Sequence, residues 1–364
     1  MIKPTDGKIG SREFFGLVLI LILIKTTGST PMYLFKLGQN ATWMMPFFFL
    51  LVIIFPYFLL YKVLNGNKDK HLIEIIYSLL GKWAGFLLIS FIFLYSFSSL
   101  VLASRSTVDI VGTLFYPITP KIMIYLFLML ASFFVAKRGL EAIGRTTWLF
   151  YPALNLFLLF ALVLAFPILH VDFLFPILGP GLPSLITSSI KHSATYGELF
   201  LLAFLYPFIR SNKDFRNSSF LGILFVTVQF SVILAVFVMA FDYPSIKNIA
   251  YPFQQLTRII EVNAVLANYD SIFLAVWVVA SVIRFAILLY ITTLIFAYMI
   301  RLEEFEPLLL PFSGLIVMLG IIPENPIVVM NFFNTVVIES GWMIINSFPV
   351  LLWATWKWKE RGAY

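Results

Sequence analysis

The chain has 364 residues, of which 61% are hydrophobic and 12% are charged, and it contains no cysteine. A water-soluble domain needs more polar surface than this composition supplies, so the sequence predicts a protein that crosses a membrane several times. Without cysteine, both a disulfide framework and a thiolate metal site are excluded.

The predicted elements are apolar stretches long enough to cross roughly 30 Å of hydrocarbon. We expect an all-α fold with ten transmembrane helices. In chain order they cover residues 13–36, 42–64, 82–113, 119–137, 145–169, 185–209, 217–241, 270–300, 304–322 and 338–357. Shorter surface helices are expected at 71–80, in the external loop 242–267, and at 326–337.

The basic residues predict the orientation of the chain in the membrane. If the N-terminus is cytoplasmic, 17 of the 25 lysines and arginines lie in cytoplasmic segments and only five lie outside. Positive residues favour the cytoplasmic side, so we expect both termini in the cytoplasm. The net charge of +7 is spread over separate loops and forms no basic stripe, so we expect a lipid bilayer around the chain and no nucleic-acid partner.

Ten spans divide into two halves of five, at residues 13–169 and 185–357 of a single transmembrane domain that covers residues 1–364. Because five is an odd number, the second half would enter the membrane from the opposite side. Inverted repeats of this kind place a substrate site near the midplane, where the first helix of each half is broken. We therefore predict a 5+5 inverted repeat with broken first and sixth helices.

Both of these helices contain residues that favour a break near the middle. In the first span, small and polar residues lead to Pro31, which removes a helical hydrogen bond, and in the sixth span Gly197 lowers the cost of leaving helical geometry. Unwound backbone at membrane depth is tolerated around a cavity or inside protein. Close packing or a kink would explain either break alone, but two breaks at matching positions favour a binding site.

Charged side chains mark the predicted site. Glu198 lies mid-span directly after Gly197, and Lys25 lies just before the first break, each without an opposite charge beside it on its own helix. Charges inside a membrane usually face a partner or a cavity, so we predict that Lys25 and Glu198 form an ion pair that lines a pocket. Two alternatives stay open: Glu198 contacts the amino group of a ligand whose carboxylate binds free amides near Gly28, or Glu198 only ties two helices together.

Three further charges lie inside predicted spans. Arg284, at the centre of the eighth span, either faces the same cavity or pairs with another buried acid. Arg105 and Asp109 are four residues apart on the third span, so they share one helix face and are expected to pair in a structural role.

The candidate ligand-binding residues gather at the two breaks and on the eighth span. They are Lys25, Thr26, Thr27, Gly28, Ser29, Thr30, Tyr196, Gly197, Glu198 and Arg284. The sequence offers neither a metal-ligand cluster nor a nucleophile with its base, so we expect no catalytic residue, no cofactor and no enzymatic activity. Third-span serines, including Ser99 and Ser106, are expected to bridge helices, with pocket lining as the alternative.

Several short motifs support a family resemblance over essentially the full length. They are the segment from Tyr196 to Leu202, the Tyr206-Pro207-Phe208 that follows it, the proline-bearing external loop, and Ala275-Val276-Trp277 of the eighth span. In these motifs the chain resembles the spore germination permeases, the B subunits of germinant receptors, in the amino acid/polyamine/organocation superfamily. Lys25 departs from the small or neutral residue expected in this family before the glycine of the first span.

The resemblance implies an amino-acid-permease fold and a function. It implies a nutrient-sensing subunit that binds a small molecule, such as an amino acid or a sugar, between the first, third, sixth and eighth helices and then triggers germination. It also implies assembly with A and C subunits in the inner membrane of the spore. A secondary transporter of an amino acid or similar solute remains the alternative, because a fold does not fix a function.

Overall fold

The computed structural model describes residues 7–68, 70–260, 269–323 and 325–362, and helices dominate this part of the chain. The first half contains α1 (Ser11–Leu23), α2 (Thr30–Gly38), α3 (Met45–Gly66), α4 (Leu72–Leu114), α5 (Lys121–Lys137) and α6 (Gly139–Ala165). The second half contains α7 (Leu182–Lys191), α8 (Glu198–Leu201), α9 (Asn212–Phe241), α10 (Pro252–Ile259), α11 (Tyr269–Met299), α12 (Leu309–Ile321), α13 (Pro326–Phe332) and α14 (Gly341–Gly362).

The described residues contain six helices that are long and apolar enough to cross a membrane. They are Thr30–Gly66, Leu72–Leu114, Gly139–Ile168, Asn212–Phe241, Ser271–Met299 and Val337–Arg361. The other expected spans are interrupted or shorter: the first and sixth are broken, α5 has 17 residues and α12 has 13. The membrane-protein class therefore fits the structure, while the ten-helix repeat stays a prediction.

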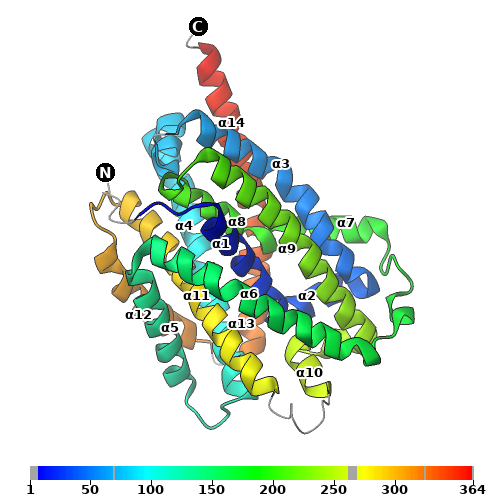
Figure 1. Cartoon of the computed structure of the whole chain (residues 1–364). Helices are drawn as coiled ribbons and strands as arrows, with labels where there is room; N and C mark the ends of the chain where they lie inside the picture. Colours follow the sequence, from blue (N-terminus) through cyan, green and yellow to red (C-terminus); the bar gives the residue numbers. More distant parts are fainter. Residues whose placement is uncertain (1–6, 69, 261–268, 324, 363–364) are drawn as a thin grey trace.

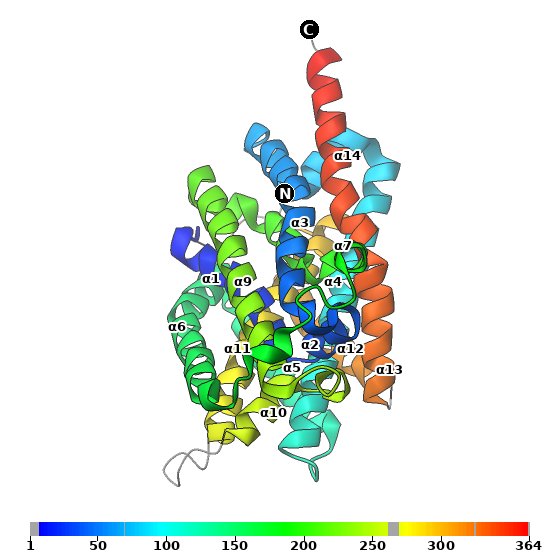
Figure 2. The same cartoon turned by 90° about the vertical axis from the view of Figure 1, so that its right-hand side faces the viewer.

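Helix α1 forms the centre of the bundle. Its residues from Leu17 to Leu23 are all buried, and it packs against α9 and α6, while α11 packs against α4, α5 and α6. Large apolar side chains such as Leu51, Phe127 and Leu149 are exposed on the outside, as expected where lipid replaces water. The C-terminal part of α14 projects beyond the bundle at the end opposite α10 (Figures 1 and 2).

Helix α4 contains the short element expected at 71–80. Gly81 interrupts the helix with φ of +79°, a backbone angle that favours glycine. The helix begins with a capping box, in which the His71 side chain accepts from the Ile73 amide at 3.3 Å and Glu74 accepts from the His71 amide at 3.1 Å.

The other two expected surface helices are also present in part. The loop 242–267 contains α10, although its residues 261–267 lie outside the described part of the chain. The segment expected at 326–337 begins as α13 and continues as a π-helical turn, Phe333–Glu339.

The N-terminal residues are attached to the end of the second broken segment. Ile9 donates its amide to the Phe208 carbonyl at 2.9 Å, and Arg210 donates its amide to the Ile9 carbonyl at 3.0 Å. These two bonds form an isolated parallel bridge between Ile9 and Ile209. Segments about 200 residues apart in sequence are thereby held side by side.

Candidate ligand-binding site

The first predicted break is present between α1 and α2. The helix tightens into a 3-10 turn, Ile24–Thr27, and Gly28 then adopts an extended conformation with φ of −98°. Pro31 has no N–H to donate to the Thr27 carbonyl four residues earlier, and this carbonyl instead accepts from Gln254 Nε2 of α10 at 2.7 Å. Because any residue can adopt the Gly28 angle, Pro31 explains the break better than the glycine does.

The second predicted break is present between α7 and α8. A 3-10 turn, Ser193–Tyr196, follows α7, and a second 3-10 segment, Leu202–Phe208, follows the single turn of α8. Gly197 is required here by space, because a Cβ at this position would lie 2.2 Å from the Tyr95 hydroxyl oxygen. Tyr95 in turn donates to the Ala194 carbonyl at 3.1 Å, so α4 presses directly on the unwound segment.

A buried charge cluster joins the two breaks. Lys25 Nζ lies 3.2 Å from Glu198 Oε1, which confirms the predicted ion pair, and it also donates to the Thr195 carbonyl at 2.7 Å. Arg284 Nη2 of α11 donates to the same carboxylate oxygen at 2.7 Å, and Ser99 of α4 donates to it at 3.0 Å. All three charged side chains are buried, and Glu198 is 0% exposed. The Glu198 carboxylate is therefore the shared counter-ion of two cations.

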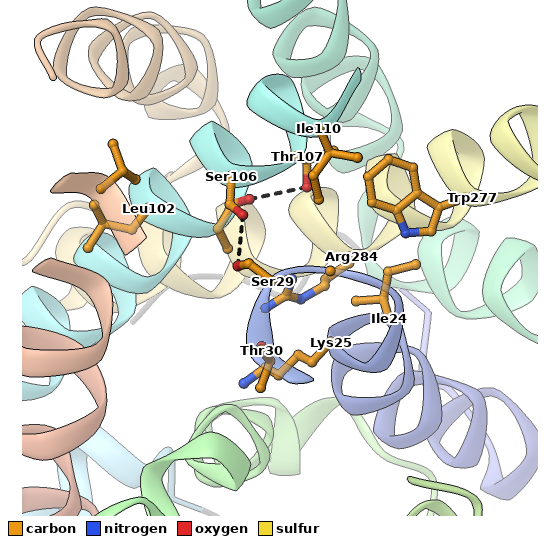
Figure 3. A pocket seen from close by; sticks show the side chains of 13 residues that line it. Ile24, Lys25, Ser29, Thr30, Leu102, Ser106, Thr107, Ile110, Trp277 and Arg284 are labelled. Carbon is orange, nitrogen blue, oxygen red and sulfur yellow. Dashed lines mark hydrogen bonds between the residues drawn. The ribbon is translucent and has the colours of Figure 1, made fainter. Parts of the chain in front are cut away.

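A small cavity of about 40 Å³ lies beside this cluster. Five of the predicted site residues line it: Lys25, Gly28, Ser29, Thr30 and Arg284. The remaining lining residues are Ile24, Leu102, Ala103, Ser106, Thr107, Ile110, Trp277 and Val329. In Figure 3 the Ser29 and Ser106 side chains face each other, and their hydroxyl oxygens are 3.1 Å apart.

The other five predicted site residues lie outside the lining of this cavity. Thr26 and Thr27 are buried and donate their hydroxyl groups back to the carbonyls of Leu23 and Ile24. Glu198 contacts both cations but does not line the cavity, and Gly197 precedes it beside Tyr95. The Tyr196 ring packs against Phe49 and Phe230, on the side of α3 and α9.

Two further side chains that the sequence did not single out as site residues hold the first break in place. Trp277 of α11 is 1% exposed and donates its indole N–H to the Thr27 hydroxyl at 2.8 Å. Gln254 of α10 is 2% exposed and binds the Thr27 carbonyl. Trp277 was visible in the sequence only as part of a family motif, and an isolated glutamine in a loop gives no signal.

The Arg105 and Asp109 pair forms a second cluster within α4. Arg105 Nε lies 2.9 Å from Asp109 Oδ2, as predicted, and Arg105 also donates to the Gly320 carbonyl of α12 at 2.8 Å. Lys121 of α5 adds a second cation, at 2.7 Å from Asp109 Oδ1. These contacts tie three helices together and agree with the structural role expected for the pair.

The apolar spans around a cavity with buried charges define a multi-pass membrane protein. The sequence profile of a family described as "Spore germination protein" matches residues 10–329. The chain therefore belongs to the spore germination protein family, which confirms the resemblance found in the sequence.

Individual relatives share modest identity with the chain. Spore germination protein XB of Bacillus anthracis is 25% identical over 288 residues, which cover 77% of this chain and 79% of the relative. Spore germination protein KB of Bacillus subtilis (strain 168) is 22% identical over 374 aligned positions, covering 98% and 96%. The match to spore germination protein B2 of the same strain, 24% identical, covers 65% of this chain and 64% of that protein.

Proposed function

We propose that the protein is the nutrient-sensing subunit of a spore germination receptor and that the cavity beside the first break is its nutrient site. The observation that carries this proposal is the combination of two irregular segments, a buried charge cluster joining them, and a cavity that Lys25 and Arg284 line. Irregular backbone and charges at membrane depth are expected around functional cavities. The nutrient is a small molecule such as an amino acid, bound between the first, third, sixth and eighth predicted helices.

The proposal includes the ten-helix 5+5 repeat. In that arrangement α1 with α2 forms the first span, and α7 with α8 and the following 3-10 segment forms the sixth. Both termini face the cytoplasm, the membrane is the inner membrane of the spore, and A and C subunits complete the receptor. Support comes from membership in the germination family and from the distribution of basic residues.

The size of the cavity links binding to signalling. A volume of about 40 Å³ has room for only a few water molecules, each of which needs roughly 10–15 Å³ in a cavity, so a whole amino acid does not fit without rearrangement. A nutrient can bind only if the segments around the cavity move apart. Binding therefore selects a different arrangement of the broken helices, and that difference is the signal passed to the other subunits.

The experiment fills the cavity and follows germination. Replacing Ser106 with Leu places an apolar side chain in the cavity, and we expect spores with this variant to lose their response to nutrients at unchanged protein level. Ser98→Leu is the matched control, because Ser98 lies on the same helix but outside the cavity lining. A normal nutrient response of the Ser106→Leu spores would contradict the proposal.

A secondary transporter of an amino acid or similar solute is the second candidate, because unwound segments beside a midplane cavity also suit transport. The purified chain, reconstituted alone in vesicles with an imposed proton or sodium gradient, separates the two functions. A sensor leaves labelled amino acids outside the vesicles, whereas a transporter accumulates them.

A further inference from the structure

The charges beside the cavity do not balance. Lys25 and Arg284 both contact Glu198, and the other buried acid of the described spans, Asp109, is already paired with Arg105 and Lys121. With both cations charged, the cluster carries one positive charge in excess. Burying an uncompensated charge is costly, so a negative ligand would be favoured at this position.

The excess charge faces the cavity. Lys25 and Arg284 line it, whereas Glu198 lies behind them and is fully buried. The described hydrogen bonds of Arg284 use Nε and Nη2, so they leave the Nη1 donor of this cavity-lining guanidinium available. In Figure 3 the Arg284 and Lys25 side chains extend toward Ser29 and Thr30.

Other residues of the cavity lining also offer donors. Ser29 and Ser106 present hydroxyl groups, and α2 begins at Thr30 without a side-chain cap on its first turn. Uncapped amides at the start of a helix favour an anion, as Lys25 and Arg284 do. Glu198, in contrast, already accepts from Lys25, Arg284 and Ser99, so it is poorly placed to receive the amino group of a ligand.

We propose that the cavity binds the carboxylate of its ligand, with Lys25 and Arg284 as the receiving groups, so that the nutrient is a small carboxylate such as an amino acid and not a sugar. This inference rests on the proposed function, in which the cavity is the nutrient site. The ligand's carboxylate supplies the charge that the cluster lacks, and the rest of the ligand occupies the space gained when the broken segments move apart.

The test uses formate and formamide, which have nearly the same size but differ in charge. The full chain in lipid nanodiscs is titrated with each, and its unfolding temperature is followed, with ionic strength held constant by a sulfonate too bulky for the cavity. We expect formate to raise the unfolding temperature in a saturable way and formamide to have no such effect. An equal effect of both compounds, or no saturable effect of formate, would overturn the proposal.

Variants locate the effect. Ser106→Leu should abolish the formate response and Ser98→Leu should preserve it; a response that survives in Ser106→Leu would reveal an adventitious ion only. Lys25→Met removes the excess charge, so its formate affinity should fall roughly tenfold or more, as for the loss of a charged hydrogen bond. Glu198→Gln adds to the excess and should bind formate more tightly. If either charge variant does not fold, the formate and formamide comparison on the unchanged protein still decides.

Measurements with amino acids distinguish a site for any small anion from a site for the nutrient itself. Each amino acid that stabilises the protein is compared with its primary amide, which should bind roughly tenfold or more weakly. If Ser106→Leu blocks germination but formate and formamide act alike, the nutrient site stands and the carboxylate inference falls. If Ser106→Leu abolishes formate binding while its spores germinate normally, the anion site stands and the proposed function falls.

Discussion

Glu198 is a carboxylate that is held by three other side chains and has no exposed surface. Its position explains why two cations can lie in the middle of an apolar bundle. Removing one partner from a buried ion pair leaves an uncompensated charge, which costs more than the pair itself contributes. Neutralising Glu198 should therefore lower the stability of the protein much more than neutralising Lys25 does.

Replacing Glu198 with Gln leaves Lys25 and Arg284 without a counter-charge, and we expect the free energy of unfolding to fall by about 3–5 kcal/mol. Lys25→Met leaves a balanced Arg284 and Glu198 pair and should cost clearly less. Thermal unfolding of the purified variants measures both. Glu141→Gln is the control, because its partner Arg145 is mostly exposed and such pairs contribute only about 0–1 kcal/mol. Equal losses for Glu198→Gln and Lys25→Met would argue against the shared carboxylate.

Gly197 can be tested by adding a single methyl group. Gly197→Ala should destabilise the protein by about 1–3 kcal/mol through overpacking against Tyr95. Gly314→Ala, in α12, is the matched control, because a Cβ there meets nothing within 4 Å and alanine favours the helix. The unfolding temperatures of the two variants decide, and similar values would show that α4 does not press on the second break.

At the scale of elements, two helices hold the first break from different sides. Helix α10 supplies Gln254 to the Thr27 carbonyl, and α11 supplies Trp277 to the Thr27 hydroxyl. Pro31 has no N–H to donate to this carbonyl. The Gln254 side chain of α10 therefore supplies the hydrogen bond that the backbone cannot make. The loop that carries α10 is thus linked directly to the first break beside the cavity.

Replacing Gln254 with Leu keeps the approximate shape of the side chain but leaves the Thr27 carbonyl without its donor. We expect a loss of about 1–3 kcal/mol in stability and an altered nutrient concentration for half-maximal germination. Gln255→Leu provides the comparison, since this neighbour is exposed on the same helix. If both variants behave like the unchanged protein, the contact between α10 and the first break has no effect on stability or on the nutrient response.

For the whole molecule, the helical class, the apolar spans and the two breaks were predictable from the sequence, because hydrophobic length and Pro31 report on local structure. The pairing of Lys25 with Glu198 was also predictable, since both charges lie at the same depth. The sequence does not give the rotation of each helix about its axis. It therefore could not show that Glu198 lies behind the cavity, or that Gln254 reaches Thr27 across more than two hundred residues.

The predicted orientation can be tested because the chain contains no cysteine. Single cysteines placed at Asn248, in the loop before α10, and at Lys213, at the start of α9, lie at exposed positions at opposite ends of α9. A membrane-impermeant maleimide applied to intact cells should label Asn248→Cys but reach Lys213→Cys only after the membrane is opened. The reverse pattern would show that the termini face outward.

The bridge between Ile9 and Ile209 has a practical consequence for anyone who wishes to purify or image the protein. A fusion joined immediately before Ile9 would pull on the segment bonded to the end of the second break, and this break carries Glu198, the partner of both cations of the cavity. Helix α14, whose last turns stand clear of the bundle, offers a safer point of attachment for tags and fluorophores.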